Sequence, residues 1–151
     1  MAEIVIDRLD PTDLTLLTHL NNQVFRPERD LAFFERRFRN RMNPLVLGAR
    51  IKDEAVGFLA GMELKPSVYF SWLVGVLPDA RRMGVASQLM NAAEDWARER
   101  GYRAIRFETG NKHRAMLHFG VAAGYDIIGI RWDVDRSENL VIFEKAIDEL
   151  L

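Results

Sequence analysis

The stretch from Val74 to Ser87, Val-Gly-Val-Leu-Pro-Asp-Ala-Arg-Arg-Met-Gly-Val-Ala-Ser, constrains the fold of this chain more than any other segment. It predicts the end of a strand, a short basic turn and the start of a helix. Residues 68–77 are rich in β-branched and aromatic side chains, which favours a strand, and Pro78 cannot extend a hydrogen-bonded ladder. From Val85 onward apolar residues recur at helical spacing, and Gly101 predicts the end of that helix.

The turn between this strand and this helix has the features of a site for a phosphate-bearing ligand. The first turn of a helix has backbone N–H groups without intrahelical partners, and the helix dipole favours an anion there. Gly84 and Ala86 lack side chains that would hold a ligand away from the backbone, and Arg81 and Arg82 add positive charge. Together these features predict a cradle for a pyrophosphate.

The same stretch resembles the signature of the GNAT superfamily of acyl-CoA-dependent N-acyltransferases, V-x-P-x-x-Q/R-x-x-G-x-G/A. The chain supplies Val76, Pro78, Arg81, Gly84 and Ala86 at the required spacing. The resemblance implies that the co-substrate is acetyl-CoA and that its pyrophosphate lies on the N–H groups near residues 82–87. The cofactor-binding residues predicted in this way are Val74, Val76, Arg81, Arg82, Met83, Gly84, Val85, Ala86, Ser87 and Asn111.

Asn111 is included because GNAT proteins commonly have an asparagine facing the cofactor after the strand that follows the motif helix. Its alternative role is to cap the next helix at its N-terminus. His113 and His118 lie far in sequence from other ligand-type residues, so no metal site is predicted.

Composition narrows the function classes. The chain has 151 residues, of which 48% are hydrophobic and 28% charged, which fits one globular domain spanning residues 1–151. Its net charge of −1 gives no indication of a nucleic-acid or membrane-surface protein. Cysteine is absent, which excludes disulfides and a cysteine nucleophile. The N-terminal residues do not resemble a signal peptide, so we expect a cytoplasmic protein.

The order of predicted elements indicates a mixed α/β fold. Strands are expected at 4–6, 45–51, 55–64, 68–77, 103–108, 126–135 and 140–145. Residues 10–13 offer caps and an early helical proline for a first helix that runs to about 24, and further helices are expected at 29–41, from 85 and at 112–123. The resemblance implies a GNAT-like fold, a central and mostly antiparallel sheet flanked by helices, splayed open beside strand 68–77 at the acyl-CoA site. Gly75, inside that strand, predicts a bulge or a close ligand approach.

Acyl transfer from a thioester to an amine needs a neutral amine, a stabilised oxyanion and a protonated leaving thiolate. The sequence offers no convincing covalent nucleophile, so direct attack in a ternary complex is predicted, with a backbone N–H near Val76 as oxyanion donor. Glu63 is the first candidate for the base, because strand alternation puts it on the face of Gly57 and Gly61. The alternative is a charge that marks the strand end. Glu108 is the second candidate, with a solvated carboxylate as its alternative.

The general acid is where this chain departs from the pattern of the family that it resembles. Many GNAT enzymes carry a tyrosine four residues before the glycine-aromatic pair that ends the last helix, and here that position is Gly120, before Gly124-Tyr125. Either Tyr69 or water is predicted to protonate the thiolate instead, or turnover is slow because no group does. His118, at the edge of the helix face, serves only if the helix is rotated.

The predicted function is therefore acetyl transfer to a primary amine, carried by a small molecule or a peptide. The alternative is a non-catalytic GNAT-fold module that holds acyl-CoA as a sensor or partner domain. A homodimer is left open. In the family that the chain resembles, the segment of the first two helices borders the acceptor site. Four arginines lie there in this chain, Arg36, Arg37, Arg39 and Arg41, and they are expected to form a solvated face.

Overall fold

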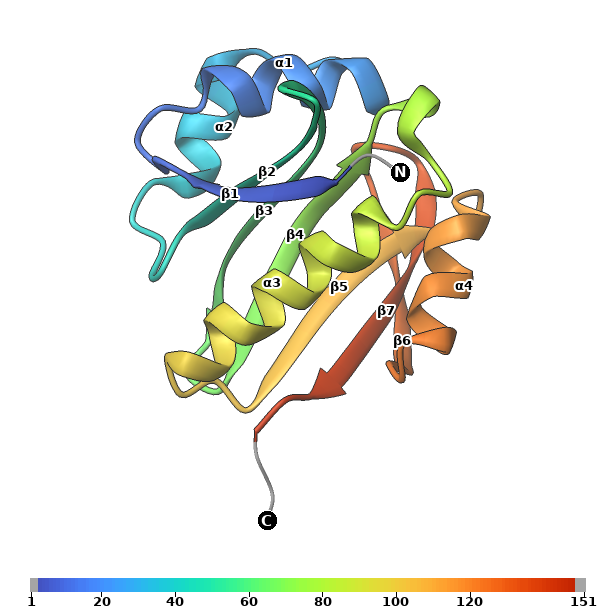
Figure 1. The fold of residues 1–151 in the computed structure, drawn as a ribbon. Helices are drawn as coiled ribbons and strands as arrows, with labels where there is room; N and C mark the ends of the chain where they lie inside the picture. Colours follow the sequence, from blue (N-terminus) through green and yellow to red (C-terminus); the bar gives the residue numbers. More distant parts are fainter. Residues whose placement is uncertain (1–2, 149–151) are drawn as a thin grey trace.

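The computed structural model describes residues 3–148, in which a seven-stranded sheet carries helices on both faces (Figure 1). The strand order is β1-β2-β3-β4-β5-β7-β6. The strands are β1 (Ile4–Leu9), β2 (Leu45–Ile51), β3 (Glu54–Lys65), β4 (Val68–Val76), β5 (Ala104–Gly110), β6 (Asp126–Asp133) and β7 (Glu138–Ala146). The helices are α1 (Thr15–Val24), α2 (Leu31–Phe38), α3 (Val85–Glu99), α4 (Arg114–Ala122) and the 3-10 turn η1 (Pro78–Ala80).

Neighbouring strands are antiparallel except β4 and β5, which run parallel. That pairing joins 68–71 to 104–107 and goes no further. Beyond Ser71 the two strands diverge, so the β4 edge that faces β5 has no strand partner over residues 72–76. The predicted fold class and the splay beside the motif strand are both confirmed.

The two faces of the sheet bury two separate cores. Helix α3 packs on one face together with α4, and the apolar positions Val85, Leu89, Ala93 and Ala97 are buried at the spacing that the sequence predicted. Helices α1 and α2 cover the other face, where Phe34 and Phe38 of α2 are buried. Figure 1 shows these layers, with α1 and α2 at one end of the sheet and α4 near the opposite edge.

The bulge in β4 lies at Trp72, not at the predicted Gly75. Gly61 pairs with Ser71 and Ala60 pairs with Leu73, so Trp72 is the extra residue. At Gly75 a Cβ would overlap the ring of Phe58. The glycine is therefore required by the packing of an aromatic side chain, and no ligand contact is needed to explain it.

Helix α1 begins later than the sequence predicted. The carboxylate of Asp10 accepts a hydrogen bond from the Thr12 N–H at 2.9 Å and stabilises a turn before the helix. The helix itself starts at Thr15, after Leu14, whose side chain gives no cap. Competition between local turn bonds and helix capping accounts for the difference.

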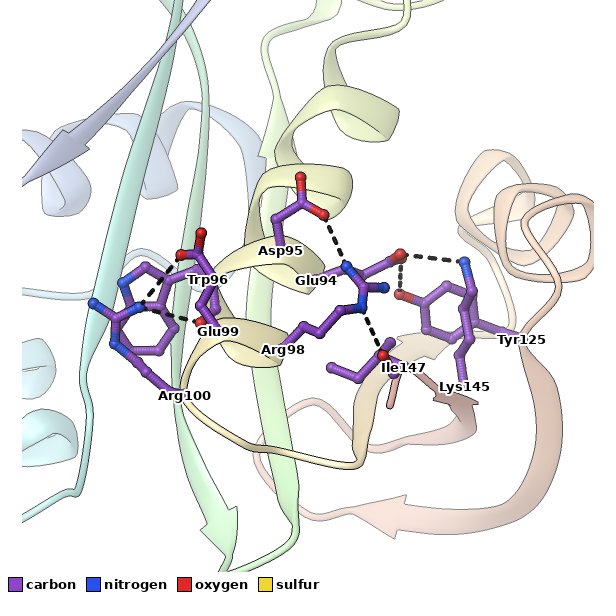
Figure 2. A network of polar contacts seen from close by, with 9 residues as sticks. All are labelled: Glu94, Asp95, Trp96, Arg98, Glu99, Arg100, Tyr125, Lys145 and Ile147. Carbon is purple, nitrogen blue, oxygen red and sulfur yellow. Dashed lines mark hydrogen bonds and ion pairs between the residues drawn. The ribbon is translucent and has the colours of Figure 1, made fainter. Parts of the chain in front are cut away.

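Polar contacts link the C-terminal half of α3 to β7 and to the residue before β6 (Figure 2). The Glu94 carboxylate is buried, accepts a hydrogen bond from the Tyr125 hydroxyl at 2.6 Å and lies 3.2 Å from Lys145 Nζ. Arg98 Nε donates to the Ile147 carbonyl at 2.6 Å. Because these contacts join α3 to the residue before β6 and to β7, they hold the helix across the sheet.

The described residues contain no helix long and apolar enough to cross a membrane. At the edge of the sheet, strand β6 exposes Ile127, Ile128, Ile130 and Trp132.

Candidate functional site

A cavity of about 530 Å³ opens where β4 and β5 diverge. Its walls come from the end of β4, the motif turn, the first turn of α3, the end of β5 and the start of α4, with Val24 and Phe25 from the end of α1. The splay of the sheet therefore brings the backbone of the motif strand and the motif turn into one site.

The motif turn has two left-handed residues, Arg82 (φ +67°) and Gly84 (φ +87°). Gly84 is the N-cap of α3, and its carbonyl accepts from the N–H of Gln88 at 3.1 Å. The N–H groups before Gln88 therefore have no acceptor within the helix. A Cβ on Gly84 would meet nothing within 4 Å, so this backbone is open. Left-handed turns at a helix start form concavities that bind anions.

Most of the predicted cofactor-binding residues line this cavity. They are Val74, Val76, Arg81, Arg82, Gly84, Val85, Ala86 and Ser87. Met83 is 49% exposed and does not line it. Asn111 also lies outside the lining, in the exposed turn after β5, and no side chain caps α4. The capping role is therefore not seen for Asn111, and its position facing the cofactor stays a prediction.

The cavity wall is strongly cationic although the chain carries a net charge of −1. It has five cationic side chains, Arg81, Arg82, Lys112, Arg114 and Arg136, and one carboxylate, Glu108. Among described residues, only Arg136 of these five has a carboxylate within 4 Å, that of Asp133 at 3.9 Å. Arg81 Nε donates to the Val76 carbonyl at 3.1 Å, which braces the turn against the strand. The wall is suited to a ligand with several negative charges.

The structure does not bring Glu63 or Tyr69 to this cavity. Gly57 of β3 pairs with Val76 at the cavity end of β4, whereas Glu63 pairs with Tyr69 at the other end, about 20 Å away at the usual rise of a strand. Strand alternation did put Glu63 on the face of Gly57 and Gly61. However, a Cβ on these glycines would meet Val85 and Tyr69, so side chains and not a ligand approach there.

At that far end the polar groups bind one another. Tyr102 donates to Glu63 Oε1 at 2.6 Å and accepts from Asn43 Nδ2 at 2.7 Å. Tyr69 donates to the Asn43 carbonyl at 2.8 Å. Burial raises the pKa of Tyr69, which disfavours its ionised form. Glu63 and Tyr69 are thus parts of a hydrogen-bonded network beneath the C-terminal end of α3.

Gly120, the position predicted to lack a general acid, is a packing site in the structure. Gly120 is buried, and a Cβ there would lie 2.6 Å from Phe143 Cε1. His118 is exposed and does not line the cavity. The Phe143 ring, which stacks on Phe107 at 4.8 Å between centroids, occupies the space that a side chain at position 120 would need.

Glu108, the second candidate of the sequence analysis, does line the cavity. Its side chain is 13% exposed, and its Oε1 accepts from Arg131 Nε at 2.9 Å and lies 2.8 Å from Arg131 Nη2. In the described part of the chain its Oε2 has no hydrogen bond, which leaves one carboxylate oxygen for a ligand. The motif gave no reason to prefer Glu108 as the base, because Arg131, which binds one of its carboxylate oxygens, comes from β6 and is distant in sequence.

His113 is a further titratable group on the wall. Its ring packs edge-on against Phe25 at 6.1 Å between centroids. Burial of the ring lowers the pKa of His113, an effect that nearby Glu138 opposes and Arg136 adds to. In the described residues no group of three or more His, Asp or Glu side chains is placed to hold a metal ion.

Comparison with known proteins is consistent with this geometry. The model of the acetyltransferase (GNAT) family matches residues 14–125. The ribosomal-protein-S18-alanine N-acetyltransferase of Escherichia coli superposes with a TM-score of 0.82 at 18% identity, over 99% of this chain and 97% of that one. At such identity the likeness shows the fold alone. No protein of curated function matches the chain significantly in sequence.

Two similar structures contain the relevant ligand. A GNAT family acetyltransferase from Elizabethkingia anophelis with acetyl-CoA bound has a TM-score of 0.76 at 14% identity, covering 97% of this chain and 98% of that one. An aminoglycoside 6′-N-acetyltransferase complexed with coenzyme A has a TM-score of 0.77 at 17% identity, covering 97% and 99%.

Proposed function

The chain belongs to the GNAT acetyltransferase family, and from this premise we propose that it transfers an acetyl group from acetyl-CoA to a primary amine. The observation that carries the proposal is the cavity between β4 and β5, where an open helix N-terminus and five cationic side chains meet the unpaired edge of the motif strand. This combination fits a ligand with a phosphorylated end and an amide-containing arm.

In this proposal the pyrophosphate lies on the motif turn, at Arg82 to Ser87, and the pantetheine arm runs back along β4. Its amides pair with the unpaired backbone between Val76 and Trp72, a length of about 13 Å. The thioester then lies near Trp72, where β4 and β5 begin to diverge and where Glu108 faces the cavity. A backbone N–H on the same edge serves as oxyanion donor.

The chain's own residues then support direct attack. The amine nitrogen attacks the thioester carbonyl carbon, and the amine proton passes to the free Oε2 of Glu108. The carbon–sulfur bond breaks, and the thiolate takes a proton from a water molecule, which regains one from the protonated Glu108. Water serves as the acid because Gly120 has no side chain and Tyr69 lies at the far end of β4. Ser71 is not a nucleophile in this scheme, because its hydroxyl is buried and contacts Met90 Sδ at 3.4 Å.

The acceptor is not given by the fold. The similar structures act on different amines by their names, an alanine of a ribosomal protein in one and an aminoglycoside in another. A cytoplasmic location and a homodimer stay predictions. The rival function, an acyl-CoA-binding module without turnover, shares the cavity and differs only in the chemistry near Glu108.

One experiment separates the two functions. Coenzyme A release is followed with a thiol reagent while acetyl-CoA and a panel of primary amines are supplied, and acetyl-CoA binding is measured in parallel by calorimetry. We expect binding, together with amine-dependent release for a subset of the panel. Binding without release for any amine contradicts the enzyme and supports the binding module. Absence of binding contradicts both.

A further inference from the structure

One arginine of α2 departs from the solvated face that the sequence predicted. Arg36, Arg39 and Arg41 are exposed, but Arg37 is half-buried. It lies between the buried Phe34 and Phe38 in sequence, and the packing of α2 on the sheet turns its side chain toward β4.

Arg37 contacts the wall of the cavity through Trp72. Its guanidinium carbon lies 4.7 Å from the centre of the Trp72 ring, and Trp72 is both the bulge residue of β4 and part of the cavity lining. Phe33, Phe34 and Phe38 surround the same indole, with centroid distances of 6.1, 5.8 and 6.2 Å. The aromatic packing fixes the indole and so fixes where the guanidinium lies.

The hydrogen-bonding capacity of Arg37 is unused. Its Nε is buried and has no hydrogen-bond partner, and no described residue forms an ion pair with its guanidinium. A buried donor without a partner is unfavourable, and native structures rarely keep one without a reason. Packing on Trp72 explains the position of the side chain but supplies no acceptor for its N–H groups.

The charges around Arg37 leave an excess of positive charge. Arg41 and Arg131 are the cationic neighbours, and Glu108 and Asp133 are the acidic ones. Both carboxylates already have partners, because Glu108 pairs with Arg131 at 2.8 Å and Asp133 lies 3.9 Å from Arg136. Burial lowers the pKa of Arg37, and the charges of Arg41 and Arg131 lower it further. An anion at this point would relieve the repulsion.

We propose that Arg37 binds the carboxylate of the acceptor, so that the substrates are primary amines of the amino-acid type. The inference rests on the proposed acetyl transfer and names its acceptor class. The amine lies at Glu108 Oε2, beside the thioester, and the carboxylate lies at the guanidinium on the α2 side of Trp72. An arginine binds a carboxylate through two parallel N–H···O bonds, so it also orients the amine.

The first test compares each amino acid with its C-terminal amide as acceptor. Arg37→Met keeps an apolar side chain on Trp72 and removes the charge, and Arg36→Gln, an exposed neighbour on the same helix, is the matched control. We expect KM for the acids to rise roughly 10- to 100-fold in Arg37→Met, with KM for the amides and for acetyl-CoA unchanged. Equal effects on acid and amide, or none on either, overturn the assignment.

The second test needs no turnover and so separates this inference from the enzyme proposal. N-acetylglycine and N-acetylglycinamide are titrated onto the coenzyme A-bound protein, and the Trp72 indole N–H resonance is followed by NMR. We expect the acid to bind roughly tenfold more tightly than the amide, and this preference to vanish in Arg37→Met but not in Arg36→Gln. The preference with no turnover contradicts the enzyme proposal alone. Equal binding, or no shift with either probe, contradicts the carboxylate site alone.

Discussion

The two ends of strand β4 differ in how their polar groups are satisfied. At the far end, Glu63, Tyr69, Tyr102 and Asn43 bind one another through hydrogen bonds of 2.6 to 2.8 Å. At the cavity end, among described residues, the N–H groups of the helix N-terminus and Arg37 Nε have no partner, and only Arg136 of the five cationic wall residues has a carboxylate within 4 Å. Polar groups without protein partners therefore distinguish the site from the scaffold.

The same comparison applies to α3. Its C-terminal half is fastened by satisfied contacts around Glu94 and Arg98, as Figure 2 shows, whereas its N-terminus opens into the cavity. One helix thus has a structural end and a ligand-binding end. The predictions that follow ask whether the two kinds of region respond differently to substitution.

The largest expected effect is on the chemical step. Glu108→Gln removes the base and should lower kcat by about 10²- to 10⁴-fold near neutral pH, with little change in affinity for acetyl-CoA. Glu63→Gln, at the satisfied end, should change kcat by less than about threefold. Steady-state rates of coenzyme A release measure both. If Glu63→Gln lowered kcat as much as Glu108→Gln does, Glu63 at the far end of β4 would be the base instead.

The next effect is on stability without any change in binding. Glu94→Leu leaves the buried Tyr125 hydroxyl without its acceptor and Lys145 without its carboxylate, so the free energy of unfolding should fall by about 2 kcal/mol. Glu99→Gln, at a side chain 75% exposed on the same helix, should change it by less than about 0.5 kcal/mol.

Urea unfolding measures these differences, and calorimetry on the folded variants measures affinity for coenzyme A. Weaker coenzyme A binding in Glu94→Leu, at a temperature where it is folded, would show that the two ends of α3 are not independent.

A loss of stability of similar size is expected at the position where the family commonly has its tyrosine. Gly120→Ala places a methyl group against the Phe143 ring and should lower the free energy of unfolding by about 1–3 kcal/mol. Gly120→Tyr should not raise kcat, because the ring cannot enter that space. Thermal unfolding and turnover measured together decide this. A stable Gly120→Tyr variant with faster turnover would show that the missing acid limits the enzyme.

The sequence predicted the cavity end well because its signal is local. Pro78, Gly84 and the apolar spacing from Val85 act within a few residues, so the strand, turn and helix follow from adjacent positions. The divergence of β4 and β5 was predicted from the resemblance to the GNAT family. By contrast, alternation along β3 placed Glu63 on the correct face but said nothing of which end of β4 it would meet, and the antiparallel register decided that.

The site proposed for the acceptor could not be predicted from the sequence in the same way, because its residues come together only in the folded chain. Arg37, Trp72, Glu108 and Arg131 come from α2, β4, β5 and β6. Nothing in the local sequence marks Trp72 as a bulge, since neither glycine nor proline adjoins it. The helix pattern also gave no sign that one arginine of four would turn toward the sheet.

The central claim, that the open N-terminus of α3 binds the pyrophosphate of coenzyme A, is tested most directly by calorimetric titration of two glycine variants. Gly84 and Gly101 flank α3 with nearly equal left-handed φ angles, +87° and +85°, and a Cβ on either meets nothing within 4 Å. Glu at each position therefore brings the same backbone strain and charge. We predict that Gly84→Glu weakens coenzyme A binding by about 100-fold or more, whereas Gly101→Glu leaves it within about twofold of the unmodified protein. Equal affinities in the two variants would contradict the claim.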